Sequence, residues 1–352
     1  MGVPRRMLRF FRKIGCFFFF LCIIVDVCPA EEIKLVTINV WSGLDYIGNI
    51  KMGEYEDSAT RENRYRLLIK NLRDIAPDVV ALNEANKLPE YARRIARDLG
   101  CDVLYHVGIG GIRVGMVGLP LNLREGDVLL ARKHCELESS GRKQLSGGPV
   151  GNILTLHTTD ATQVIGGRIR VSGRYIYVFN THWHASEFAQ QESLGELVEK
   201  YTTGRLESNS FLDSISDAVE GSQWRLNEAR KTLEFIDKVA GDAPVILMGD
   251  FNALHFSEEI ETIKAAGFID TYAALNTKPG YTWDELLNTN ITRHYHNEKT
   301  DGLKRRRDRI DYIFVRGNEL VPLRSRVVFN TARDGLHPSD HFGVFSVVAV
   351  SE

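Results

Sequence analysis

The sequence predicts a layered α/β sandwich that forms one large domain. Short apolar segments with the alternation of strands recur along the chain, and segments with apolar residues at helical spacing separate several of them. No internal repeat, low-complexity tract or linker rich in Pro and Gly interrupts the 352 residues. A chain of this length can bury a large core, and its hydrophobic and charged fractions are those of a globular protein.

The first thirty residues form a separate segment with the pattern of an export signal. Five basic side chains precede or border an apolar run from Ile14 to Val25, and Cys28-Pro29-Ala30 follows. A basic start, a short apolar run and a small residue before the cut are typical of a cleaved signal peptide, and the run is short for a membrane span. We expect residues 31–352 to be secreted or periplasmic, with membrane anchoring as the alternative if the leader is retained.

Charge and cysteine content limit the partners of the exported part. Loss of residues 1–30 removes five of 44 basic and one of 46 acidic side chains, which leaves a net charge of −6. An acidic chain is not a general nucleic-acid binder, so any polyanion must be contacted locally.

Cys101 and Cys135 remain, and both a disulfide and two buried free thiols are compatible with export.

Strands and helices alternate over the first hundred residues. The pattern predicts a strand over Ile33–Trp41 and a helix over Tyr65–Ile75, which Pro77 stops. A second apolar strand, Asp78–Glu84, precedes a helix that opens at Pro89 and closes at Gly100.

Strands dominate the remainder, and their short spacing favours antiparallel hairpins. Residues 186–221 are polar and helix-prone without a wide apolar stripe, and we interpret them as an inserted helical cap or lid on a domain spanning 31–352. The pattern predicts strands at 103–105, 127–131, 151–157, 163–171, 175–180, 245–250, 309–315 and 342–350, and helices at 226–240 and 257–266.

One predicted strand, Val245–Asp250, leads into a carboxylate and a carboxamide two residues apart. Gly249 ends the apolar run, and Asp250 and Asn252 project to the same side because side chains alternate along a strand. A hard oxygen ligand beside an amide suits Mg²⁺ and a phosphate. The structural alternative is an Asx turn that closes the strand.

Polar side chains stand at the ends of six predicted strands. If these strands share a sheet, their ends converge on one rim, and charges buried there need a partner or a metal. Each residue alone has an ordinary explanation as a loop charge, a turn residue or a structural histidine. All these explanations would have to hold independently, and together they are improbable. The residues are Asn39, Glu84, His182, Asp250 with Asn252, Asp311, and Asp340 with His341.

This set suits hydrolysis of a phosphoester. Glu84, Asn39 and Asp340 are the candidate ligands of Mg²⁺, with Mn²⁺ as an alternative, and such a metal neutralises charge on phosphoryl oxygens. The candidate catalytic residues have distinct roles: Asp311 orients His341, Asp250 positions or deprotonates water, Asn252 binds a phosphate oxygen, and His182 stabilises the transition state or serves the leaving group.

The same segments resemble the endonuclease/exonuclease/phosphatase superfamily, which has the DNase I-like fold. The resemblance implies a four-layered α/β/β/α sandwich of two mixed, mostly antiparallel sheets, Mg²⁺-dependent phosphoester cleavage, Glu84 as the principal metal ligand and Asp311–His341 as a dyad. The matching segments, in family order over nearly the whole exported chain, are Thr37–Trp41, Leu82–Glu84, Asn180–His182, Gly249–Ala253, Arg309–Ile313 and Pro338–Phe342.

Four further residues are candidates for substrate binding. Arg305 belongs to a basic run, Lys304–Arg309, that can contact flanking phosphates, although a solvated loop explains it equally. Arg132 and Arg168 are candidates for the same rim. Trp183 can stack a base or sugar, with core packing as the alternative.

The sequence therefore predicts an exported phosphodiesterase acting on nucleic acid, a phospholipid head group or an inositol phosphate. We expect a monomer without an obligate protein partner. Two alternatives stay open: a zinc hydrolase built on the pairs His182/His184 and His337/His341, and a non-catalytic binding protein on the same fold.

Overall fold

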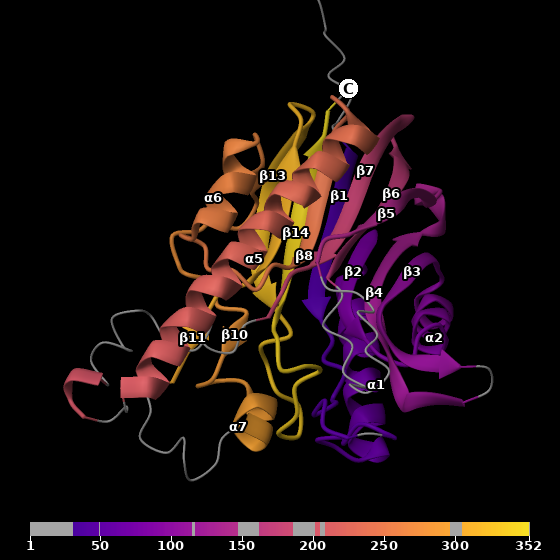
Figure 1. Ribbon diagram of the computed structural model, residues 1–352. Coiled ribbons are helices and arrows are strands. Elements are labelled where there is room, and N and C mark those ends of the chain that lie inside the picture. Colours follow the sequence, from indigo (N-terminus) through magenta and orange to yellow (C-terminus); the bar gives the residue numbers. More distant parts are fainter. Residues whose placement is uncertain are drawn as a thin grey trace, which may run out of the picture.

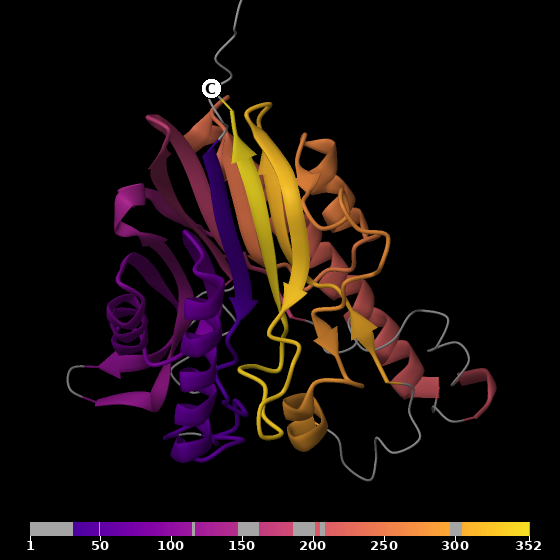
Figure 2. The ribbon, with the colours of Figure 1, turned by 180° about the vertical axis from the view of Figure 1, so that it is seen from behind.

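Two six-stranded sheets pack face to face, with helices on both outer faces (Figure 1, Figure 2). The computed structural model describes residues 31–48, 50–114, 117–146, 162–185, 201–204, 208–295 and 305–351. The leader, the strand expected at 151–157 and most of the first part of the expected insert lie outside these residues. The observed layers confirm the expected α/β/β/α sandwich.

The first sheet contains the strand that ends at Asn39. Its central strand β1 runs parallel to β2 and antiparallel to β14. The order across the sheet is β13 (Leu320–Val328), β14 (Gly343–Val350), β1 (Glu31–Asn39), β2 (Val79–Ala85), β4 (Val117–Arg132) and β3 (Cys101–Val114).

The second sheet contains the strand that ends at Asp250. Here β8 runs parallel to β7 and antiparallel to β12. The order is β5 (Glu138–Gln144), β6 (Gln163–Val171), β7 (Arg174–His182), β8 (Val245–Asp250), β12 (Asp311–Arg316) and β9 (Ile269–Asp270).

Local signals set the ends of the helices. In α1 (Ser58–Ile75), the Asp57 carboxylate accepts a hydrogen bond from the backbone N–H of Thr60, which caps the first turn.

α1 and α2 cover the first sheet, whereas α5 and α6 cover the second (Figure 2). The other elements are α2 (Glu90–Leu99), the 3₁₀ turn Lys133–Cys135, α5 (Ser208–Ala240), α6 (Glu258–Ala265), α7 (Thr289–Tyr295) and the ribbon of β10 (Trp283–Asp284) and β11 (Arg307–Asp308).

Alternation along the strands separates the core into layers. In β1, Leu35 packs between the sheets together with Ile246 and Ile313 of the second sheet, whereas Val36 and Ile38 face the layer beneath α1 and α2. The central strands are therefore buried on both sides, and this rigid scaffold fixes the positions of the residues at their ends.

Several element boundaries differ from those expected. The helix expected at 226–240 is the C-terminal half of the much longer α5, which begins at Ser208 and includes the end of the proposed insert. Strands β5 and β13 were not predicted from the sequence because most of their side chains are exposed or only partly buried. Cys101 and Cys135 are both free, so the disulfide alternative is wrong.

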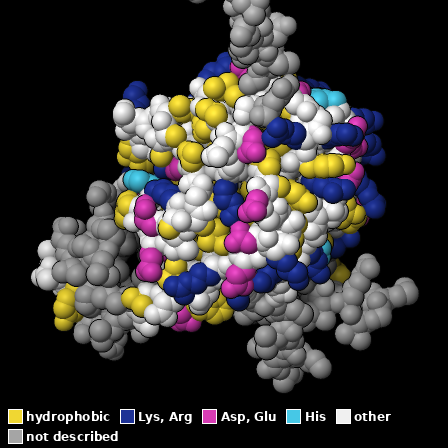
Figure 3. All heavy atoms as spheres, turned by 90° about the horizontal axis from the view of Figure 1, so that it is seen from above, with side chains coloured by type: hydrophobic (Ala, Val, Ile, Leu, Met, Phe, Trp, Pro, Cys, Tyr) yellow, Lys and Arg dark blue, Asp and Glu magenta, His cyan; other side chains and the backbone are white. Residues whose placement is uncertain are grey.

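The surface at the end where the C-terminus lies carries mixed charge. Figure 3 shows Lys, Arg, Asp and Glu side chains interspersed there without one dominant sign. Among the described residues, no helix has the length and apolar character needed to cross a membrane.

Candidate active site

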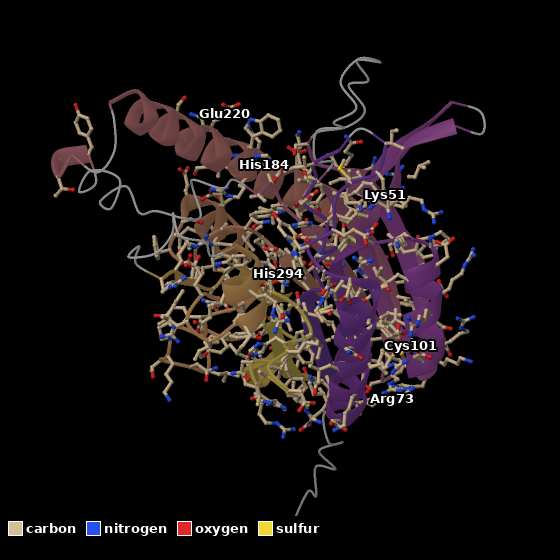
Figure 4. The ribbon with its side chains drawn as sticks, turned by 90° about the horizontal axis from the view of Figure 1, so that it is seen from below. Lys51, Arg73, Cys101, His184, Glu220 and His294 are labelled. Atoms are coloured by element: carbon tan, nitrogen blue, oxygen red, sulfur yellow. The ribbon has the colours of Figure 1, made fainter. Side chains whose placement is uncertain are left out.

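The predicted strand ends meet at the opposite end of the sandwich, which Figure 4 shows from below with His294 of α7 near the centre. Strand pairing brings them together. His182 of β7 is the register partner of Asp250 on β8, and Asp250 is in turn the partner of Asp311 on β12. Residues 68 and 61 positions apart in the sequence thus become neighbours because three strands pair side by side.

Asn39 links the two sheets at the centre of this end. Its Nδ2 donates to Oε1 of Glu84 at 2.7 Å and to Oδ2 of Asp250 at 3.0 Å, while its Oδ1 accepts from the N–H of Trp41. Glu84 has a left-handed backbone with φ of 54°, and its Oε2 accepts from the N–H of Ser42 at 3.3 Å. Asn39 thus acts as a hydrogen-bonding bridge that orients two carboxylates.

His182 lies between the same two carboxylates. Its Nε2 is 3.7 Å from Oδ2 of Asp250 and 4.0 Å from Oε1 of Glu84. Burial disfavours the imidazolium, but the negative charges of Asp250 and Glu84 outweigh burial and raise the pKa of His182 to about 9. The side chain therefore presents a cation to the site at neutral pH.

His341 forms a dyad with Asp311. Its Nδ1 lies 2.9 Å from Oδ2 of Asp311, and its Nε2 lies 3.8 Å from Oδ2 of Asp250. Burial again opposes the charged ring, yet Asp311 and Asp250 raise the pKa of His341 to about 10. The Trp283 ring packs edge-on against this imidazole at 5.1 Å, which fixes the ring further.

The Asp250–Asn252 segment closes β8 as an Asx turn and leaves one carboxylate oxygen facing the cluster. Oδ1 of Asp250 accepts from the N–H of Asn252 at 2.9 Å, as in an Asx turn, while Oδ2 faces the histidines. Asn252 donates from Nδ2 to the carbonyl of Trp183 at 2.9 Å. A Cβ at Gly249 would meet the carbonyl oxygen of Thr181 at 1.9 Å, so only glycine permits this close approach of β8 to β7.

Asp340 is buried beside Glu84 and His341. Its Oδ1 lies 3.1 Å from the Ser339 hydroxyl, which is also 2.6 Å from the carbonyl oxygen of Asn39. Burial is the main cause that raises the pKa of Asp340 to about 6, and the charge of Glu84 acts in the same direction.

Two buried asparagines that the sequence analysis quoted but did not assign connect the sheets behind the site. Asn83 donates to Oδ1 of Asp127 at 2.7 Å and to Oδ1 of Asn180 at 3.1 Å, and it accepts from the N–H of Asp250 at 3.0 Å. Asn180 donates to the carbonyls of Leu82 and Val128. Their fully buried amides therefore hold the backbones that carry Glu84 and Asp250.

The pair Tyr46–Glu125 was also missed. The Tyr46 hydroxyl lies 2.5 Å from Oε2 of Glu125 and 3.1 Å from Oγ of Ser42, whose N–H contacts Glu84. Burial, followed by the charge of Glu84, raises the pKa of Glu125 to about 8. Nothing in the local sequence marks Glu125, because it lies within β4 and its proximity to Glu84 arises only from sheet pairing.

Three predicted substrate-binding residues do not reach the site. Arg132 donates to the carbonyls of Pro77 and Leu99 at the opposite end of β2. Arg168 pairs with Glu138 in the outer part of β6 and β5. Trp183 is fully buried, and its ring packs edge-on against Phe251 in the core. The rim prediction for these residues is wrong, since sequence alone did not show which strand end each one occupies.

Arg305 lies two residues before β11 and has a buried Nη1 without a hydrogen-bond partner among the described residues. The neighbouring Arg306 donates its N–H to Oε2 of Glu285 and places its guanidinium 5.4 Å from the centre of the Trp283 ring. Because Trp283 contacts His341, the basic run borders the candidate site through Arg306, although its first residue, Lys304, lies outside those described.

One histidine of each pair in the zinc hypothesis contacts residues outside the cluster. His184 packs against Trp224, and His337 lies 2.9 Å from the hydroxyl of Thr289 through its Nδ1. Within the described part of the chain, the group with ligand atoms close enough to hold a metal is instead Asp250, Asp311 and His341, within 4.8 Å of one another.

The donors at this site fit a hard divalent cation. Carboxylates supply most of them, Oδ1 of Asp311 is buried without a hydrogen-bond partner, and Glu84 is only partly buried, so ligand and solvent can reach it. Oxygen-rich sets of this kind favour Mg²⁺ or Mn²⁺ over softer metals.

The sequence that forms this site matches a known protein family. The model of the Endonuclease/Exonuclease/phosphatase family matches residues 36–341, which include every residue of the cluster. The chain belongs to this family. It is thus a phosphoester hydrolase, and the resemblance predicted from its motifs is confirmed. No curated protein matches the sequence.

Solved structures show the same fold. TDP2 from D. rerio, in complex with a single-strand DNA product, is 20% identical with a TM-score of 0.57, and the match covers 91% of this chain and 100% of that one. A family protein from Bacteroides vulgatus is 16% identical with a TM-score of 0.57, covering 91% and 100%. Truncated TDP2 from Caenorhabditis elegans is 12% identical, also at 0.57, covering 91% and 98%.

Proposed function

We propose that this family member is a Mg²⁺-dependent phosphodiesterase. The observation that carries the proposal is the buried cluster in which Oδ2 of Asp250 lies within 3.8 Å of Nε2 of both His182 and His341, with Asp311 behind His341. Such a cluster combines a base, two cations and an orienting carboxylate around one point.

Glu84 is the residue that would hold the metal first, with Asp340 close by and Asn39 orienting the carboxylate. Glu84 is the partly exposed carboxylate of the cluster, and the Asn39 amide fixes its Oε1. Bound there, Mg²⁺ supplies charge neutralisation for the phosphoryl oxygens.

Asp250 is the proposed base. Burial and the neighbouring charge of Asp311 raise the pKa of Asp250, which makes its carboxylate a better proton acceptor near neutral pH. Its Oδ2 is oriented by the Asn39 amide, so it can position a water for attack on phosphorus. Asn252, held by the same turn, is the proposed contact for a phosphate oxygen.

The two histidines act as cations around the phosphate. His182 and His341 each carry a raised pKa, to about 9 and about 10, and positive charge stabilises the pentavalent transition state. Asp311 keeps His341 in one orientation and stabilises its protonated form. Proton donation to the leaving oxygen is assigned to His182.

Nucleic acid is the proposed substrate class, with phospholipid head groups and inositol phosphates as the alternatives. Arg306 packs on Trp283 at the His341 side of the site, and we assign contacts with flanking phosphates to it and to the adjoining Arg305. The D. rerio TDP2 structure contains a single-strand DNA product, which supports the same class. We further propose export of residues 31–352 on the basis of the leader.

One panel tests the proposal: purified residues 31–352 with Mg²⁺ on plasmid DNA, RNA, sphingomyelin and inositol phosphates. We expect hydrolysis of the nucleic acids that stops when a chelator removes the metal. Cleavage of none of these substrates, or cleavage supported by Zn²⁺ and not Mg²⁺, contradicts it.

A further inference from the structure

A cavity of about 310 Å³ opens beside Glu84, at the ends of α1 and α2 where these helices begin. Val40, Trp41 and Ser42 of the loop after β1 form one wall, and Glu84 with Lys87 forms another. Neither His182 nor His341 lines it. The volume is at the lower limit of roughly 300 to 1,000 Å³ found for ligand pockets.

Apolar and aromatic groups form the floor of this cavity. The rings of Tyr65 and Tyr91 meet edge to face with their centres 5.7 Å apart, and Leu68 and Pro338 complete the surface. Such a floor favours a compact ring over a fully hydrated sugar or a phosphate.

The charged groups around the floor are mostly neutralised by partners. Arg64 lies 2.5 Å from Oε1 of Glu56, and Arg94 makes two hydrogen bonds of 2.7 Å to Glu62. Lys87 is the cavity-lining cation whose ammonium has no hydrogen bond or ion pair among the described residues. A polyphosphorylated ligand needs several unpaired cations, so this cavity does not suit an inositol polyphosphate.

A quaternary ammonium group also fits poorly. Such cations bind to open aromatic faces. Here the Arg94 guanidinium covers the Tyr65 ring at 3.8 Å, and that of Arg64 covers the Trp41 ring at 4.7 Å. Two faces that choline would need are therefore occupied by cations.

A hydrogen-bonding group remains at the floor. The Tyr91 hydroxyl has no hydrogen-bond partner within the described ranges, and burial raises its pKa to about 12, so it keeps its proton near neutrality. An uncharged, flat ring with acceptors at its edge matches an apolar floor, a free hydroxyl and one ammonium. Nucleobases have this chemistry.

We propose that the cavity beside Glu84 binds the base of a nucleotide next to the scissile phosphate. Glu84 lines both the cavity and the candidate metal site, so a base seated on Tyr91 lies beside the phosphate that the cluster attacks. This inference rests on the proposed function, and it selects nucleic acid among the substrate classes considered there.

The test compares dinucleotides that carry a base on both sugars with dinucleotides that lack the base on one or the other side, and uses bis-p-nitrophenyl phosphate as a diester without a base. With Mg²⁺, removal of one particular base is expected to lower kcat/KM about tenfold or more, since stacking and burial of a base contribute this much. Equal turnover of base-containing and abasic dinucleotides by the wild-type protein overturns the inference.

Variants then assign the base effect to this cavity. Tyr91→Leu keeps an apolar side chain but removes the ring and hydroxyl, and it is expected to abolish the difference between base-containing and abasic substrates while bis-p-nitrophenyl phosphate hydrolysis stays near wild type. A base preference that persists in folded Tyr91→Leu contradicts the inference.

A surface variant keeps the test decisive if Tyr91→Leu does not fold. Lys87→Glu changes an exposed ammonium at the cavity and should lower kcat/KM for the dinucleotide about threefold or more by repelling its phosphate. Lys70→Glu, on the exposed side of α1, is the matched control and should change nothing. Equal effects of the two substitutions on kcat/KM contradict binding of the substrate in the cavity. Failure to hydrolyse any diester, including the one without a base, contradicts the proposed function itself.

Discussion

Nδ1 of His341 lies 2.9 Å from Oδ2 of Asp311, and both side chains are almost completely buried. The two residues are on different elements, since Asp311 begins β12 and His341 precedes β14. A buried carboxylate at this distance fixes the imidazole orientation and stabilises its protonated form. The dyad therefore gives the first prediction.

Asp311→Asn should lower kcat for a phosphodiester by about 10²- to 10⁴-fold with little change in fold, because the amide has nearly the shape of the carboxylate but no charge. Steady-state kinetics measure kcat, and circular dichroism measures whether the fold is kept. Asp308→Asn, in the adjacent ribbon, is the control and should keep most activity. Full activity of Asp311→Asn contradicts the dyad.

Metal removal should abolish hydrolysis reversibly. Glu84, Asp250, Asp311 and Asp340 place four carboxylates in one site, and without a cation their repulsion disfavours an anionic phosphate. Dialysis against a chelator followed by readdition of single metals measures this. Mg²⁺ or Mn²⁺ should restore turnover. Activity that survives complete removal of divalent metal opposes the assignment.

The affinity for Mg²⁺ should rise between about pH 6 and 8. Burial raises the pKa of Asp340 to about 6 and that of Glu125 to about 8, so these carboxyls hold protons in the metal-free protein. A bound cation favours their charged forms, so binding releases protons and strengthens as pH rises through these values.

Titration calorimetry in two buffers of different ionisation enthalpy counts the protons released on binding. Glu125→Gln should reduce the release near pH 7. A Mg²⁺ affinity that is independent of pH over this range contradicts the prediction.

The asparagine network should contribute to stability as well as to the site. In Asn180→Leu the carbonyls of Leu82 and Val128 lose their donor in the core, at a cost of about 1–3 kcal/mol for each group left unpaired. Urea unfolding measures the free energy of unfolding. Asn63→Ala, on the exposed face of α1, is the control, with an expected change within about 0.5 kcal/mol. Equal stabilities of the two variants contradict the structural role.

The sequence predicts most of the central fold because the strands that carry the site are continuous apolar runs. β6 (Gln163–Val171) has the expected bounds, and the helix expected at 257–266 is α6, which Ser257 caps. Edge strands β5 and β13 were not recognisable, since one or both faces meet solvent and apolar alternation disappears.

The residues of the site likewise divide into those that the sequence could predict and those that it could not. Asn39, Glu84, His182 and Asp250 were predictable because each ends an apolar strand, where a polar group is unexpected. Glu125 was not, because its approach to Glu84 depends on the β2–β4 register. Register also explains the error at Arg132, which lies at the far end of the same strand.

The most direct test of the account is the Mg²⁺-dependent hydrolysis of a generic phosphodiester by Glu84→Ala and His341→Ala, each confirmed to be folded. Glu84 lies on β2 and His341 lies just before β14, so the two residues come from distant parts of the chain. We predict that each substitution alone abolishes turnover. Near wild-type rates in both variants would show that the converging strand ends are not the catalytic centre.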